Sequence, residues 1–116
     1  MKKKAKDYNT SLLTDVYGAL LTKHQLDLIR DYYDLDMSLS ELSEKYGIAR
    51  QSAKGAIDAA EKSLNDIEDK LQLVKRLKQI DNYTDKLLEL KPSQYDYDKY
   101  VDLIKKIKSS IYFTAE

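Results

Sequence analysis

The sequence contains no cysteine and no tryptophan, and only one proline and three glycines among its 116 residues. The lack of cysteine excludes disulfide bonds, thiolate metal sites and cysteine nucleophiles, as is usual in a reducing compartment. The scarcity of glycine and proline disfavours a turn-rich β fold, and leucine, isoleucine, valine and tyrosine supply most of the apolar side chains. The composition therefore predicts an all-α fold.

The sequence also lacks any apolar run long enough to cross a bilayer. Its first residues, MKKKAKDYNTS, are basic like the start of a signal peptide, but no apolar segment follows them. We therefore expect no membrane insertion and a cytoplasmic location. A length of 116 residues is typical of a single domain with one modest core.

Neither sign of charge is in excess, because twenty basic residues balance twenty acidic ones. A neutral chain gives no electrostatic reason to expect tight, non-specific binding to polyanions. The charges are nevertheless unevenly distributed, since residues 1–6 carry four lysines whereas residues 7–46 carry eight acidic and three basic residues. Any nucleic-acid-binding surface must therefore be local.

Apolar residues at helical spacing predict three helices in the first half of the chain. Two of them begin with a capping box, in which a hydroxyl and a Gln or Glu side chain three residues later satisfy free backbone amides. Thr22 with Gln25 opens the second helix, and Ser38 with Glu41 opens the third. The predicted helices span roughly residues 9–21, 23–33 and 39–46.

A long helix is predicted from Arg50 onward, because apolar residues recur there at alternating steps of three and four. They are Ile57, Ala60, Leu64, Ile67, Leu71 and Val74. This register fails afterwards, so we expect a kink or break at residues 76–82. A further helix ends before Pro92, whose ring disfavours helical geometry at the preceding residue. A last amphipathic helix carries the stripe Tyr97, Tyr100, Val101, Ile104, Ile107 and Ile111.

The stretch MSLSELSEKYGIARQSAKGAI, residues 37–57, joins a short capped helix to the long one. Gly47 can take the left-handed conformation that ends the short helix. The inner faces would bury Leu42, Tyr46, Ile48, Ala53 and Ile57. This is the pattern of a helix-turn-helix, in which residues at the start of the second helix reach base edges in the major groove. The outward residues there are the candidate nucleic-acid-binding residues Arg50, Gln51, Ser52 and Lys54.

The types of these four residues favour nucleic-acid binding, whereas the local charge does not. Arginine suits guanine edges and phosphates, glutamine suits adenine edges, and serine and lysine suit phosphates. However, residues 38–63 hold four basic and four acidic side chains, and Asp58, one turn beyond Lys54, would oppose phosphate binding. From these residues alone, a structural or protein-binding three-helix unit explains the pattern as well as a nucleic-acid reader does.

The segment ALLTKHQLDLIRDYYDLDMSLSELSEKYGIARQSAKGAIDAAEKSLNDIEDKL resembles the bacterial YlxM family, small helix-turn-helix proteins similar to region 4 of sigma factors. The resemblance covers roughly residues 10–75. It rests on LLT followed by Gln, on the YY-L-D-SL-E run of residues 32–41, on Arg50 with Gln51, and on the later Ile57, Glu61, Lys62 and Leu64. It implies a DNA-binding or regulatory protein associated with the signal recognition particle pathway, without catalytic activity.

Two departures from the family pattern weaken nucleic-acid contact and leave the fold intact. Members usually have a serine cap before the Arg-Gln pair, where this chain has Ala49. Alanine cannot accept the first-turn amides, which costs ~1 kcal/mol. Members also tend to carry a basic pair where this chain has Asp58 and Ala59.

The remaining polar groups indicate no catalytic or metal site, and we assign no cofactor. His24 has no Cys or Ser partner for catalysis and is expected to be exposed. Asp31, Asp34 and Asp36 lack the glycine and closing glutamate of an EF-hand, and such acids more often solvate a turn. A secondary basic patch could meet RNA phosphates, although such mixed faces are usually just solvated. It consists of Lys70, Lys75, Arg76 and Lys78.

These patterns divide the chain into a basic flexible tail (residues 1–8), a sigma-region-4-like helix-turn-helix domain (9–63) and a helical extension (64–116). The apolar stripes of the long and last helices could cover each other in an antiparallel hairpin. We instead expect a homodimer with the extension as its interface, because each chain offers more apolar area than one hairpin hides.

We expect a protein that binds and does not catalyse. Its leading function is that of an accessory or regulatory factor of the signal recognition particle pathway. Its partners would be DNA, the particle's RNA or the pathway's protein components. A DNA-binding transcription regulator and a purely protein-binding helical adaptor are the alternatives.

Overall fold

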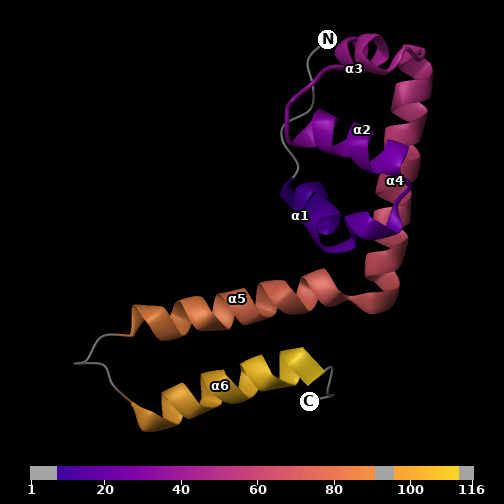
Figure 1. The fold of residues 1–116 in the computed structure, drawn as a ribbon. Coiled ribbons are helices and arrows are strands. Elements are labelled where there is room, and N and C mark those ends of the chain that lie inside the picture. The colour runs from indigo at the N-terminus through magenta and orange to yellow at the C-terminus, as the bar shows by residue number, and fades with distance from the viewer. Residues whose placement is uncertain (1–7, 91–95, 113–116) are drawn as a thin grey trace. The chain divides into compact units, whose positions relative to one another are not determined.

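A computed structural model describes residues 8–90 and 96–112, so the expected tail lies almost wholly outside the described residues (Figure 1). Within those ranges the structure contains α-helices and one 3-10 turn, and no strand. The all-α prediction is confirmed. The elements are α1 (Tyr8–Tyr17), η1 (Gly18–Leu20), α2 (Lys23–Tyr33), α3 (Leu39–Tyr46), α4 (Arg50–Leu71), α5 (Leu73–Glu89) and α6 (Tyr97–Tyr112).

Both predicted capping boxes are present. The Thr22 hydroxyl accepts from the Gln25 amide at 3.1 Å, and the Gln25 side chain accepts from the Thr22 amide at 3.2 Å. Ser38 and Glu41 make the same exchange at 3.1 and 2.8 Å. Because each box satisfies two amides that the helix leaves open, α2 and α3 begin where the sequence predicts.

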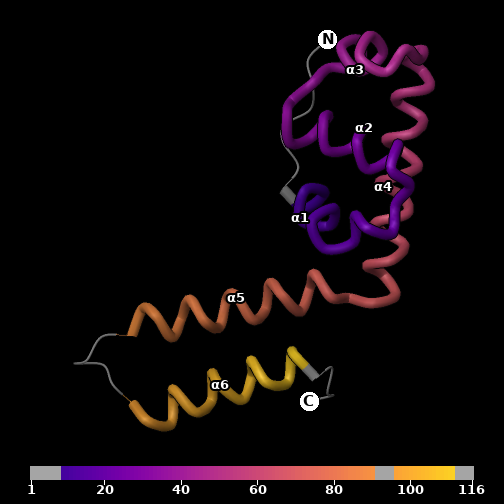
Figure 2. Tube along the Cα trace, viewed as in Figure 1, coloured from indigo at the N-terminus to yellow at the C-terminus, as the bar shows by residue number. Residues whose placement is uncertain are grey.

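The chain divides into two compact units, residues 1–71 and residues 72–116. In the first unit α1, α2 and α3 pack against α4, which runs through the expected domain boundary at residue 63 to Leu71 (Figure 2). Its buried apolar side chains come from all four helices and include Leu13, Tyr17, Leu28, Ile29, Leu42, Ala53, Ile57, Ala60 and Leu64. The first half of the predicted seam is therefore core of the chain's own domain.

Polar side chains tie α4 to the helices packed on it. The Tyr17 hydroxyl donates to the Glu68 carboxylate at 2.5 Å, and the Tyr33 hydroxyl donates to Glu61. Both tyrosine rings are buried while their hydroxyls reach carboxylates at the edge of the core. This satisfies the polar end of a side chain whose ring is removed from water.

The expected break at residues 76–82 was wrong in position. Gln72 takes the left-handed conformation, with φ of 54°, and separates α4 from α5. The α5 helix then runs without interruption from Leu73 to Glu89. Val74 belongs to α5 and not to α4. The change of apolar register that follows it in the sequence therefore lies within α5, which has already begun at Leu73. A side chain with a Cβ pays roughly 1 kcal/mol for this conformation.

The second unit is an antiparallel hairpin of α5 and α6. The Arg76 guanidinium donates to the Ser110 carbonyl at 3.5 Å, and the Ser110 hydroxyl donates to the Gln79 side chain at 3.2 Å. The predicted stripe on α6 was partly wrong, because Leu103 and Ser110 are the buried residues whereas Tyr97, Ile104 and Ile111 are exposed. The face of α6 that packs against α5 therefore lies one residue away from the most apolar face of α6.

Candidate nucleic-acid interface

The turn between α3 and α4 is held by reciprocal hydrogen bonds. Gly47 is left-handed, with φ of 65°, as predicted, and its amide donates to the Ser43 carbonyl. The Ile48 amide donates to the same carbonyl at 3.1 Å, and the Ser43 hydroxyl donates back to the Ile48 carbonyl. The turn is therefore fixed by side-chain and backbone bonds together, and the start of α4 is held against the end of α3.

The inner faces of the two helices are buried as predicted for a helix-turn-helix. Leu42 and Ala53 are fully buried, and Ile57 is almost so, whereas Tyr46 and Ile48 are half-buried. Because Gln51 and Ser52 lie two positions and one position before Ala53, this packing turns both of them outward.

Three of the four predicted binding residues gather in the first turn of α4. Arg50, Gln51 and Ser52 are all exposed, and this turn contains no acidic residue. The Ala53 amide donates to the Ala49 carbonyl at 3.0 Å, so the helix starts with Ala49 in the cap position. Alanine has no side-chain oxygen to occupy the first amides, and these amides carry the positive end of the helix dipole. The end of the helix therefore presents donors and a cation on one exposed turn.

Lys54 stands one turn further along and is paired. Its ammonium contacts Asp58 at 2.8 Å, and both side chains are more than half exposed. The hydrogen bond to Asp58, and then the charge of that carboxylate, raise the pKa of Lys54 above its ordinary value. Lys54 is thus positive at any physiological pH, but its charge is already balanced locally, as the sequence predicts.

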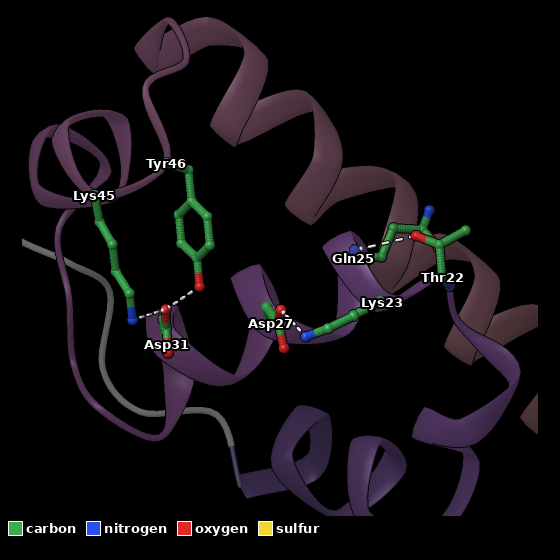
Figure 3. A network of polar contacts seen from close by, with 7 residues as sticks. All are labelled: Thr22, Lys23, Gln25, Asp27, Asp31, Lys45 and Tyr46. Carbon is green, nitrogen blue, oxygen red and sulfur yellow. Dashed lines mark hydrogen bonds and ion pairs between the residues drawn. The ribbon is translucent and has the colours of Figure 1, made fainter.

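A second polar group joins α2 to α3, where Asp31 of α2 meets Lys45 and Tyr46 at the end of α3 (Figure 3). Lys45 donates to the Asp31 carboxylate at 2.8 Å, and the Tyr46 hydroxyl donates to the same oxygen. The expectation that Asp31 solvates a turn is wrong, because this residue is buried. The signal available in the sequence was its spacing of three residues from Leu28, which puts an acid on the apolar face of α2.

The environment of Asp31 holds it ionised. Burial would raise the pKa of its carboxyl, but the hydrogen bonds from Lys45 and Tyr46 and the charge of Lys45 outweigh burial, and the pKa lies below the ordinary value of 3.8. The ring of His24 meets that of Tyr46 edge-on at 6.0 Å, and His24 is exposed as expected. This group joins α2 to α3, so it positions the helix that precedes the candidate site.

Asp34, another acid of this region, also serves as a structural partner. Asp34 accepts from Arg30 at 3.0 Å and from the Ser11 hydroxyl at 3.0 Å, while Arg30 contacts Asp15 of α1 at 3.1 Å. Asp36 takes a left-handed conformation, with φ of 60°, in the link to α3. Within the part of the chain that the structure describes, no three acidic or histidine side chains form a group able to hold a metal ion.

The secondary basic patch is distributed over both units. Lys70 lies in the last turn of α4, in the first unit, whereas Lys75, Arg76 and Lys78 lie in α5, in the second. Arg76 is half-buried and donates to α6, while the three lysines are exposed. The four residues are therefore close in sequence without belonging to one helix. Among the helices described, none is long and apolar enough to span a membrane.

Comparison with known proteins agrees with this geometry. Residues 4–107 match the profile of the UPF0122 family, described as "Putative helix-turn-helix protein, YlxM / p13 like". The chain is 47% identical over 77 residues to a UPF0122 protein of Thermoanaerobacter sp. (strain X514), a match covering 66% of each chain.

Two further relatives extend the comparison. A UPF0122 protein of Desulforamulus reducens is 40% identical over 72 residues, which is 62% of each chain. One of Clostridium kluyveri is 35% identical over 101 residues, covering 87% of this chain and 90% of the relative. The matches to the first two relatives thus span just under two thirds of their length, whereas the third spans most of it. The chain belongs to the UPF0122 family of YlxM-like helix-turn-helix proteins.

Proposed function

We propose that this protein is a non-enzymatic regulatory factor that binds nucleic acid through the first turn of α4. The observation that carries the proposal is the exposure of Arg50, Gln51 and Ser52 together at the start of a helix whose opposite face is buried. In helix-turn-helix proteins this is the end of the recognition helix that contacts base edges. The family assignment supports the same use of the site.

The residue types assign a role to each side chain. Arg50 would donate to guanine O6 and N7, and Gln51 would pair with the N6 and N7 edge of adenine. Ser52 and Lys54 would contact phosphates, with Lys54 leaving Asp58 to do so. Because few phosphates can be neutralised, the binding would be weak and would fall steeply with salt.

Duplex DNA suits this site better than duplex RNA does. The major groove of B-form DNA admits an α-helix, whereas that of A-form RNA is too narrow and deep for side chains to read. If the ligand is the RNA of the signal recognition particle, the site would have to meet unpaired bases in a loop or bulge. The resemblance to YlxM proteins is what supports an accessory role in that pathway, and a DNA-binding transcription regulator remains the alternative within the same chemistry.

The secondary basic patch and self-association belong to the same proposal. Lys70, Lys75, Arg76 and Lys78 would add phosphate contacts beyond the helix-turn-helix. A homodimer would present two copies of the α4 end to one duplex, as dimeric helix-turn-helix proteins do. A purely protein-binding adaptor is favoured by a different observation, the large apolar side chains exposed on α5 and α6. In each case the proposed place of action is the cytoplasm.

Fluorescence anisotropy tests the nucleic-acid proposal. Labelled duplex DNA and the particle's RNA are titrated at two salt concentrations with the protein and with an Arg50→Ala/Lys54→Ala variant. We expect the double substitution to abolish binding while circular dichroism shows unchanged helical content. Lys62→Ala is the matched control, because Lys62 pairs with Asp66 at 2.8 Å on the same helix, as Lys54 does with Asp58. Equal losses in the two variants, or none, would contradict the proposed site.

A further inference from the structure

The outer surface of the α5–α6 hairpin carries large apolar side chains on both helices. Leu77 and Leu88 of α5 and Tyr97, Ile104 and Ile111 of α6 are exposed, with 83% of Leu88, 69% of Tyr97 and 52% of Ile104 open to solvent. Side chains of this size rarely gather on the surface of a protein that acts alone. We call these five residues the hairpin face.

Helix geometry puts all five residues on the same side of the hairpin. Leu77, Ile104 and Ile111 directly follow Arg76, Leu103 and Ser110, which bond to the other helix or are buried. Leu88 comes eleven residues after Leu77 and Tyr97 seven residues before Ile104, and these spacings return to nearly the same side of a helix. One residue corresponds to a rotation of about 100°, so both helices turn these side chains a quarter-turn away from their contact. In an antiparallel pair the same rotation leads to the same side of both helices. On α6 the residues also recur every seventh position, at residues 97, 104 and 111.

The charges of the hairpin are separated along its length. Residues 73–80 and 103–112, which lie at one end, contain six basic residues and no acidic one. Residues 81–90 and 96–102, at the other end, contain six acidic and two basic residues. Lys106, one of the six bases, bridges back to Asp102 at 3.2 Å, so the remaining imbalance lies in the outer turns. One end of the hairpin is thus basic and the other acidic.

We propose that the hairpin face binds the same face of a second copy of this chain, with the two hairpins antiparallel. A two-fold axis across the helices would put the basic end of each copy over the acidic end of the other, whereas a parallel arrangement would oppose like charges. Lys78 of one copy would approach Asp85 of the partner subunit, and Lys108 would approach the partner subunit's Asp98. These residues flank the hairpin face on the sides away from the contact between α5 and α6.

This interface deepens the homodimer proposed above, but it does not depend on nucleic-acid binding. The seam of the first unit is not needed for it, because its three buried residues Ile57, Ala60 and Leu64 belong to the core of that unit. Leu71 is exposed but lies outside the hairpin. Covering the exposed leucine and isoleucine side chains supplies the attraction, and the charge separation selects the direction.

Sedimentation equilibrium of the full chain at micromolar concentration is the first test. We expect a dimer whose dissociation constant rises about tenfold or more in Leu88→Asp/Ile104→Asp, since two central apolar contacts would then carry buried charges. The control is Asn82→Asp, which introduces one negative charge at an exposed position of α5 away from the hairpin face. Because the substituted residues are exposed within one chain, circular dichroism should be unchanged, and Tyr97→Glu provides an independent variant. A monomer at all concentrations, or an unaffected dimer, would overturn the proposal.

Disulfide trapping tests the direction, and the absence of native cysteine makes it clean. Leu77→Cys and Leu88→Cys are prepared separately, mixed and oxidised. The antiparallel arrangement predicts disulfides between the two different variants and few within either. The two positions are about 16 Å apart along α5, whereas a disulfide needs Cα atoms within roughly 7 Å, so neither variant can bridge to itself in the antiparallel arrangement. In a parallel two-fold pair α5 would lie over α6 of the partner subunit, and the two substituted positions would not meet. Absence of the mixed disulfide would therefore overturn the proposed direction. Anisotropy with labelled DNA on the same variants separates failure of this interface from failure of nucleic-acid binding.

Discussion

The two units of this chain bury their apolar side chains in different ways. In the first, four helices enclose leucines and isoleucines from every element, and buried tyrosines end in hydrogen bonds to carboxylates. In the second, two helices bury little besides Val74, Leu103 and Ser110, and leave six large apolar side chains exposed. A pair of helices has only one contact face, so it cannot hide two stripes. The first unit therefore has a core of its own, whereas the second leaves an apolar surface exposed.

The largest expected effect compares the two cores. Leu28→Ala in the first unit should lower the free energy of unfolding by about 3 kcal/mol, because the side chain is fully buried and the cavity it leaves is enclosed. Leu103→Ala should instead raise amide exchange in α5 and α6 while leaving the first unit protected. Urea denaturation combined with hydrogen exchange measures both. Identical loss of protection across all helices in both variants would show that the units unfold as one.

The hydrogen bonds that Asp31 accepts in the first unit give the next largest effect. Asp31→Asn should lower the free energy of unfolding by about 1–2 kcal/mol, since hydrogen bonds from Lys45 and Tyr46 to a carboxylate become bonds to a neutral amide. Ser110→Ala in the hairpin, whose hydroxyl bonds Gln79 at 3.2 Å, should cost less because no charge is involved. A smaller loss for Asp31→Asn than for Ser110→Ala in urea denaturation would contradict this ranking.

The same carboxylate predicts a pH dependence. Because the pKa of Asp31 is lower in the folded protein than its ordinary value of 3.8, its contribution is complete above that value and is lost as the pH falls through the folded pKa. The stability difference between the protein and Asp31→Asn should thus be constant near neutral pH and shrink below about pH 4. Thermal denaturation in a series of buffers measures it. A difference that grows on acidification would mean that the carboxylate is not stabilised by its partners.

A smaller effect concerns the turn between α3 and α4. Gly47→Ala should lower the free energy of unfolding of the first unit by about 1 kcal/mol, because a Cβ is disfavoured at φ of 65°. Gly55→Ala is the matched control, since Gly55 lies inside α4 with open space around its missing Cβ, and there alanine should stabilise the helix. Opposite signs in urea denaturation are the expected result, and two changes of equal sign would contradict the account of the turn.

The smallest effect concerns the first turn of α4. Ala49→Ser should raise the stability of the first unit by about 0.5–1 kcal/mol, because the hydroxyl can accept an amide that Ala49 cannot. The α5–α6 amides should exchange at an unchanged rate, which makes this a local test of the separation between the units. An equal gain in protection of both units would argue against that separation.

Local signals in the sequence predicted the first unit well. Thr22 with Gln25, Ser38 with Glu41, and Gly47 act through bonds or backbone angles within a few residues, so no other part of the chain is needed to interpret them. The outward position of Gln51 and Ser52 follows from the burial of Ala53 on the same helix, and Arg50 is exposed as the first residue of that helix. Neither the residue spacing nor the helix geometry identifies the molecule that these residues bind.

The order of residues alone specifies three features: the helical character of the chain, the capping boxes that begin α2 and α3, and the left-handed turn at Gly47. Each of them depends only on residues within one or two helical turns. The tertiary structure alone decided which stripe of α6 is covered, where α4 ends and what holds Asp31. The first and the last of these depend on a side chain far away in sequence, such as Ser110 for Gln79 or Tyr46 for Asp31. A helix with two adjacent apolar stripes can pack against its partner with either stripe. Only the packed pair of helices shows that Leu103 is buried whereas Ile104 is exposed to solvent.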